Sequence, residues 1–101
     1  MITCIIRVDA SSEIGYGHLM RCLALGEQLR SSFDILFLVR HKNTATKIRK
    51  QEFRVYEIAS DVDDESVMIS LSSKYPNAVW IIDIKKQFSK GFLPELKRHA
   101  N

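Results

Sequence analysis

Runs of β-prone residues alternate with helical patterns along the whole chain, and this alternation limits the fold more than any other feature. The first run is β-prone throughout, which is typical of a strand covered on both faces of a sheet, and the second run is also predicted to form a buried strand. The sequence predicts four strands, over Ile2–Val8, Phe33–Val39, Phe53–Ile58 and Ala78–Asp83.

The first helical pattern runs from His18 to about Arg30. Within it, apolar or small residues recur at three- and four-residue spacing and therefore share one face of the predicted helix. This face comprises Leu19, Cys22, Leu23, Gly26 and Leu29.

Three shorter helices are predicted after the later strands. Asn43 or Thr44 is expected to cap a helix that ends near Gln51. The acidic segment Ser60–Glu65 supplies a cap and a negatively charged first turn for the next helix, which suits the helix dipole. A fourth helix is expected over Leu93–His99.

Strands that alternate with helices predict βαβ units, a parallel sheet and right-handed crossovers. We therefore expect an α/β fold: one Rossmann-like domain over residues 1–101, with about four strands in the order 3-2-1-4 and flanking helices. No fifth strand is predicted after the last helix, so one sheet edge would stay open, which natural proteins usually avoid. The chain is therefore expected to be a fragment of a longer protein.

Composition narrows the classes of function. The net charge of +3 is mild, and the basic run Lys47–Lys50 lacks interleaved aromatic residues, so a nucleic-acid partner is not expected. The apolar runs are too short to span a bilayer, and no signal peptide is visible, so a cytoplasmic location is expected. Cys4 and Cys22 are interpreted as buried free thiols. His41 and His99 have no partner at metal-ligand spacing, so no metal is expected.

The loop between the first strand and the first helix, Asp9–Gly17, is long for such a connection. In open α/β sheets, ligands bind beyond the carboxyl ends of strands where the strand order reverses, which places the ligand here. Gly15 and Gly17 would allow positive φ and close approach of a ligand. The dinucleotide fingerprint fails, because Met20 replaces its third glycine and Arg40 replaces the acid after the second strand. No cofactor is therefore expected.

His18 is the candidate catalytic residue in this segment. The positive end of the helix and the guanidinium of Arg21, one turn later, both disfavour a charged imidazole. A neutral imidazole is the form that a general base needs near neutral pH. Alternatively, His18 only caps the helix or packs under the loop.

The segments Arg7–Ser12 and Ile14–Leu25 resemble the start of the UDP-2,4-diacetamido-2,4,6-trideoxy-β-L-altropyranose hydrolases of pseudaminic acid synthesis and of related spore coat polysaccharide biosynthesis proteins. The glycine-x-glycine-histidine-x-x-arginine core is intact from Gly15 to Arg21, and the resemblance covers about the first 30 residues. This family is similar in fold to two-domain GT-B glycosyltransferases, so the chain would be the N-terminal half of such a fold.

The resemblance implies that water attacks the anomeric carbon of a UDP-activated amino sugar, that UDP leaves, and that His18 is the base. It also implies a C-terminal domain that holds most of the UDP, so the 101-residue chain alone would have little or no activity. The expected substrate-binding residues lie around the first loop and at the end of the fourth strand: Asp9, Ser11, Ser12, Gly15, Tyr16, Gly17, Arg21 and Asp83.

Several alternatives stay open. Asp9 could face the substrate, orient His18 or cap a turn, and Asp83 could be a cap, since the aromatic residue that often follows it in the family is missing at Lys85. A glycosyltransferase of the same architecture would use a sugar hydroxyl in place of water. A non-catalytic domain that binds sugar nucleotides or another protein could keep the same loop. The basic cluster Arg40–Lys42 is interpreted as a solvated loop rather than a phosphate site.

Overall fold

Four parallel strands form a single sheet in the order β3-β2-β1-β4, which confirms the predicted topology. The computed structural model describes residues 1–10, 15–85 and 87–100. Strands and helices alternate throughout. In chain order they are β1 (Thr3–Val8), α1 (Gly17–Leu29), β2 (Asp34–Val39), α2 (Lys42–Lys50), β3 (Arg54–Glu57), α3 (Asp64–Lys74), β4 (Val79–Asp83) and α4 (Phe92–Ala100).

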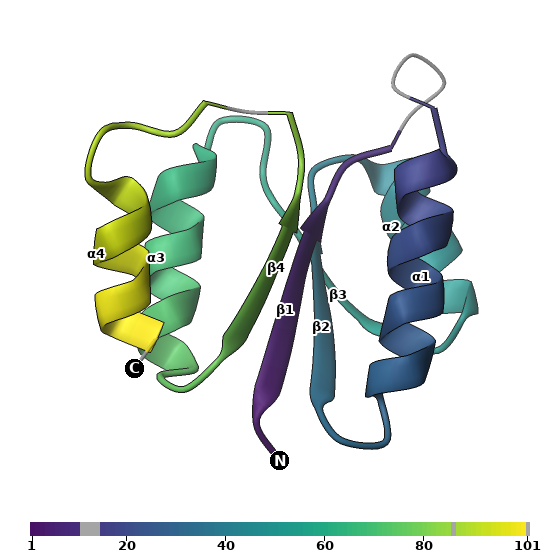
Figure 1. The fold of residues 1–101 in the computed structure, drawn as a ribbon. Helices are drawn as coiled ribbons and strands as arrows, with labels where there is room; N and C mark the ends of the chain where they lie inside the picture. The colour runs from purple at the N-terminus through teal and green to yellow at the C-terminus, as the bar shows by residue number, and fades with distance from the viewer. Residues whose placement is uncertain (11–14, 86, 101) are drawn as a thin grey trace.

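Helices cover both faces of the sheet, with α1 and α2 on one side and α3 and α4 on the other (Figure 1). Successive strand side chains point to opposite faces, so β1 contributes to two cores. Cys4, Ile6 and Val8 pack on the α1 side, and Ile5 packs on the α3 side. Every residue of β1 is buried, as its β-prone run predicted.

The apolar face predicted for α1 is the face that meets the sheet. Leu19, Cys22 and Gly26 are buried there, while Leu23 and Leu29 pack half-buried beside them. Gly26 lets α1 lie close to the sheet, because a Cβ on this residue would lie 3.3 Å from the Phe37 ring and 3.2 Å from the Phe53 ring.

The ends of two helices test the predicted caps. Asp63 caps α3 by accepting a hydrogen bond from Ser66 N at 3.1 Å, so the cap predicted within the acidic segment is confirmed. The predicted cap of α2 is wrong, because the N-cap residue is His41, which makes no side-chain capping bond. Thr44 lies one turn further on, fully buried, and its hydroxyl donates to the carbonyl of Ala10. This hydroxyl serves to attach α2 to the chain after β1.

The two outer strands differ from the inner ones in exposure. β3 and β4 each pair with one neighbour, and their residues are half-buried or exposed. Phe37 in β2 is fully buried, whereas Trp80 in β4 is only half-buried. Within the described ranges, no helix has the length and apolar character needed to cross a membrane.

Candidate functional site

The first turn of α1 faces the carboxyl end of β4, where His18 and Asp83 meet. His18 Nδ1 lies 3.0 Å from Oδ1 and 3.1 Å from Oδ2 of Asp83. Asp83 ends β4 and is in register with Val8, the last residue of β1. The strand order reverses between β1 and β4, so the pair lies at the switch point where open α/β sheets bind ligands. The side chains are 40 % and 25 % exposed, so solvent reaches both.

Arg21 also reaches this pair. Its Nη2 lies 3.2 Å from Asp83 Oδ2 and 2.8 Å from His18 Nδ1. Guanidinium groups only donate and carboxylates only accept, so Nδ1 cannot serve both neighbours. We place a proton on His18 Nδ1, pointing toward Asp83, because an Nδ1 lone pair would face the negatively charged carboxylate. The Arg21 side chain, which is 68 % exposed, can then donate to Asp83 rather than to Nδ1. Nε2 then keeps the free lone pair that a general base needs.

Asp83 receives hydrogen bonds from three side chains of α1. Burial alone would raise its pKa, but the bonds from His18, Arg21 and Cys22 outweigh burial and lower the pKa of Asp83 below its ordinary value. The carboxylate is therefore ionised at neutral pH and can stabilise positive charge on the imidazole.

Cys22 contributes its thiol to the same carboxylate, with Sγ 3.5 Å from Asp83 Oδ2. Burial, followed by the negative charge of Asp83, raises the pKa of Cys22 to about 12. The thiolate is the nucleophilic form of cysteine, so this thiol is inert at neutral pH. The interpretation of Cys22 as a buried free thiol is confirmed.

Asp9 is held by Arg7, two residues earlier in the chain. Arg7 Nη1 donates to Asp9 Oδ1 at 2.7 Å, and Nη2 donates to Oδ2 at 3.0 Å. This is a bidentate pair, which fixes the plane of the carboxylate. The sequence left open whether Asp9 orients His18. The carboxylate that hydrogen-bonds to the imidazole is that of Asp83, so we assign this orienting role to Asp83 and not to Asp9.

Arg7 is fully buried and needs a second anion as well. Its Nε and Nη2 donate to Asp64 Oδ1, at 3.1 and 2.9 Å, at the start of α3. Burial tends to raise the pKa of Asp64, but Arg7 and then Arg40 outweigh it and lower the pKa. Two carboxylates around one guanidinium compensate for the loss of hydration that burial imposes.

The sequence reasoning missed this network. Its signal was a single charged residue, Arg7, inside an otherwise apolar strand. The interpretation of the Arg40–Lys42 cluster as a solvated loop is wrong for Arg40, whose guanidinium donates to the carbonyls of Ala59 and Val62 and to Asp64. Arg40 thereby attaches the loop before α3 to the end of β2.

The glycine-containing turn before α1 is described from Gly15 onward. Gly15 has a φ of 92°, as expected, whereas Gly17 is the first residue of the helix and has no positive φ. Tyr16 is the N-cap residue, and its ring packs against the core on the α1 side, 5.2 Å from Lys47 Nζ. The predicted substrate-binding residues Ser11 and Ser12 lie outside the described residues.

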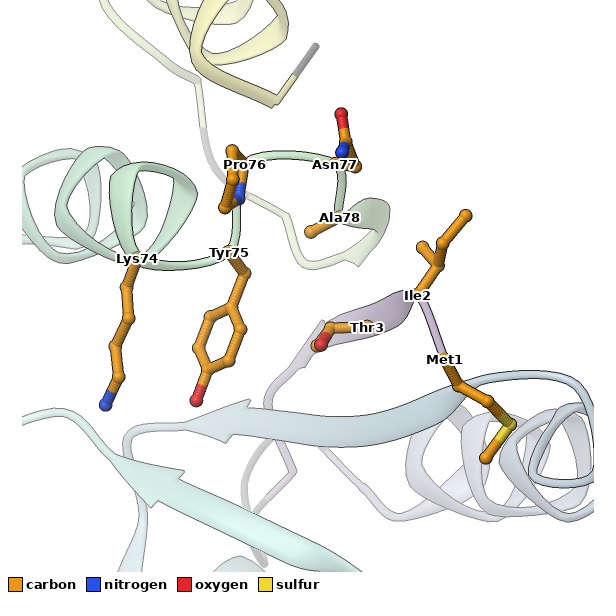
Figure 2. Close-up of a pocket in the computed structure, with 8 residues that line it drawn as sticks. All are labelled: Met1, Ile2, Thr3, Lys74, Tyr75, Pro76, Asn77 and Ala78. Carbon is orange, nitrogen blue, oxygen red and sulfur yellow. The ribbon is translucent and has the colours of Figure 1, made fainter.

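A hollow of about 250 Å³ lies at the opposite, amino end of the sheet (Figure 2). Lys74 and Tyr75 reach it from the end of α3, and Ile2 and Thr3 line it from the start of β1. None of the residues expected to bind a substrate lines this hollow.

A larger hollow, of about 470 Å³, lies between α1 and α2, with Leu19, Leu23 and Phe53 among its lining residues. Helical spacing places it on the side of α1 away from His18 and Arg21. Among the described residues, no group of histidine, cysteine and acidic side chains is arranged to hold a metal ion.

Comparisons of the chain with protein-family models, with curated protein sequences and with solved structures give no match.

Proposed function

We propose that this chain is the N-terminal domain of a nucleotide-sugar hydrolase that releases UDP from an activated amino sugar in surface or spore-coat polysaccharide biosynthesis. The observation that carries the proposal is the hydrogen bond between His18 Nδ1 and Asp83 at the switch point of the sheet. The glycine-x-glycine-histidine-x-x-arginine motif from Gly15 to Arg21 supports the same assignment.

The proposed reaction is a displacement by water at the anomeric carbon. His18 Nε2 takes a proton from the water while its oxygen forms a bond to the anomeric carbon. The bond between that carbon and the UDP oxygen breaks, and UDP leaves with the electron pair. The carboxylate of Asp83, 3.0 Å from Nδ1, stabilises the imidazolium that forms and holds the ring in one orientation.

The proposed substrate contacts lie around this base. Arg21 is largely exposed and carries a positive charge beside Asp83, so it would contact a phosphate or an acetamido group. Gly15 and Tyr16 precede the first turn of α1, and Gly17 begins it; the free amides of this turn favour a negatively charged oxygen. A second, nucleotide-binding domain would hold most of the UDP, and the reaction would occur between the two domains.

The test is UDP release from candidate UDP-amino sugars by the natural protein that joins this domain to its nucleotide-binding domain. His18→Ala should lower kcat by at least about 100-fold, and Asp83→Asn by at least about tenfold. His41→Ala is the matched control, because His41 lies at the start of α2 outside the site. Sugar transfer to an added acceptor would identify a transferase, and unchanged turnover in His18→Ala would disprove the base.

The 101-residue chain is assayed beside the longer protein. It should release little or no UDP, because the proposed site lacks the domain that holds the nucleotide. Full activity of the chain alone would contradict the two-domain proposal.

A further inference from the structure

Three side chains of α1 meet the carboxylate of Asp83, and they differ in how firmly they are held. Arg21 and Cys22 follow His18 by three and four residues, so the three side chains share one face of the helix. The Arg21 side chain is 68 % exposed, whereas Cys22 is only 3 % exposed. Cys22 packs in the same core cluster as Val8 at the end of β1. The thiol is therefore the donor whose position is fixed by packing.

The two oxygens of the Asp83 carboxylate face different donors. Arg21 Nη2 lies 3.2 Å from Oδ2, and Cys22 Sγ lies 3.5 Å from the same oxygen. A carboxylate oxygen offers two lone pairs, so these two donors together occupy Oδ2. His18 Nδ1 lies 3.0 Å from the other oxygen, Oδ1. The Nδ1 proton is thereby directed to Oδ1.

The Asp83 carboxylate depends on these donors for its orientation. Asp83 is the last residue of β4, and its side chain is part-exposed. Within the described part of the chain, the hydrogen bonds to this side chain all come from α1. The nearest carboxylate in the neighbouring chain segment, that of Asp9, is held by Arg7 instead. The donors of α1 therefore decide which oxygen of Asp83 meets the imidazole.

We propose that Cys22 is a positioning residue for His18, because its thiol holds Oδ2 of Asp83 together with Arg21 and leaves Oδ1 to bind the Nδ1 proton. Cys22 acts only through Asp83. Without the thiol, the exposed Arg21 side chain alone holds Oδ2, and the carboxylate is free to rotate about its Cβ–Cγ bond. The imidazole then loses the fixed partner that keeps the proton on Nδ1 and the lone pair on Nε2. The effect on catalysis rests on the proposed function, whereas the effect on the imidazole does not.

The tautomer of His18 in the intact 101-residue chain tests this role. Cys22→Ala and Cys22→Ser leave side chains of nearly equal size, but only serine can donate a hydrogen bond to Asp83. The ratio of Nδ1-protonated to Nε2-protonated neutral imidazole, read from the ¹⁵N shifts of the ring, should fall about fivefold in Cys22→Ala, the effect of one ordinary hydrogen bond. In Cys22→Ser the ratio should stay within about twofold of the wild-type value.

The ionisation of Asp83 gives a second readout in the same samples. The thiol bond favours the ionised carboxylate, so Cys22→Ala should raise the pKa of Asp83, and Cys22→Ser should keep that pKa low. The carboxyl ¹³C shift of Asp83 follows this titration. A role in packing alone would not separate alanine from serine.

Cys4→Ala is the matched control, because it removes the other buried free thiol. Cys4 lies near the start of β1, in register with Val79 at the opposite end of β4 from Asp83. This variant should change neither the tautomer of His18 nor the pKa of Asp83. Amide spectra check that each variant is folded. An unchanged tautomer ratio in Cys22→Ala, or the same fall in Cys22→Ser, would overturn the positioning role.

The catalytic effect is measured in the natural protein that joins this domain to its nucleotide-binding domain. Cys22→Ala should lower kcat for UDP release about fivefold with KM unchanged, and Cys22→Ser should restore kcat. Absence of UDP release in the wild-type protein would contradict the proposed function, while the tautomer ratios of the 101-residue chain would still support the positioning role. Equal kcat in the wild type and Cys22→Ala would count against the positioning role and leave the proposed function standing.

Discussion

His18 Nδ1 lies within 3.1 Å of both carboxylate oxygens of Asp83, although the two residues are 65 positions apart in the chain. The contact depends on the placement of β4 directly beside β1, which brings the end of β4 under the first turn of α1. A carboxylate in this position fixes both the tautomer and the orientation of an imidazole.

This arrangement predicts the tautomer of His18 in the isolated chain. In the neutral form, the proton should be on Nδ1, because the carboxylate of Asp83 accepts a hydrogen bond from that atom. In Asp83→Ala this acceptor is lost, and the proton should move in part to Nε2. The nitrogen shifts of ¹⁵N-labelled His18 report the two forms directly. His41, at the start of α2, serves as the internal control and should not change.

Cys22 should resist alkylation in the folded chain. Burial and the Asp83 carboxylate raise its pKa to about 12, so almost no thiolate is present at about pH 8. Iodoacetamide should therefore label Cys22 slowly in buffer and fully in denaturant, as measured by mass spectrometry of the intact chain and of its peptides. Rapid labelling of Cys22 in the folded chain would contradict the hydrogen bond to Asp83.

The raised thiol pKa also affects stability at high pH. A group whose pKa is raised by folding contributes stability below its unfolded value and loses that contribution as the pH rises through its folded value. For Cys22 this loss falls between an ordinary value of 9.0 and about 12. Cys22→Ala should make the free energy of unfolding less dependent on pH in that window.

Asp64 should make the chain sensitive to acid. Burial opposes ionisation of Asp64, but Arg7 and Arg40 outweigh it, so the pKa is lowered by folding. The stability that results is present above the unfolded value of about 3.9 and is lost as the pH falls through the folded value. Asp64→Asn should lower the free energy of unfolding by about 3 kcal/mol near neutral pH, because it leaves the buried guanidinium of Arg7 with one anion fewer.

Urea denaturation from neutral pH down to about pH 3 measures the free energy of unfolding and its dependence on pH. Asp64→Asn should also show a weaker dependence on pH than the wild-type chain. Asp61→Asn, at an exposed position in the loop before α3, is the control and should leave both quantities unchanged. If Asp64→Asn kept the full acid dependence, the ionic network would not be its source.

The sheet order was predictable because few topologies satisfy a chain of alternating strands and helices with right-handed crossovers. The burial of β1 followed in the same way from its β-prone run, Thr3–Val8. The cap of α2 was not predictable from local preference. Thr44 is a good capping residue by type, but burial directs its hydroxyl to the carbonyl of Ala10.

The candidate site was predictable only in part. Placing Asp83 at the carboxyl end of its strand brought it to the same crevice as His18, but the hydrogen bond between them needed the relative placement of α1 and β4. The role of Arg7 was hidden for the same reason, since Asp64 lies 57 positions away. Motifs within a few residues are readable in a sequence, whereas charge pairs across the sheet depend on the tertiary fold.

Gly15 and Gly17 belong to the same motif but should respond in opposite ways to substitution by alanine. Gly15 has a φ of 92°, a conformation that alanine adopts only with strain, so Gly15→Ala should lower the free energy of unfolding by about 1 kcal/mol. Gly17 starts α1, and an added Cβ there would meet no described atom within 4 Å. Gly17→Ala should therefore be neutral or stabilising by up to about 1 kcal/mol, because alanine loses less backbone entropy on folding. Urea denaturation of both variants beside the wild-type chain measures the difference, and equal destabilisation by the two would show that the conformation of Gly15 is not what requires a glycine.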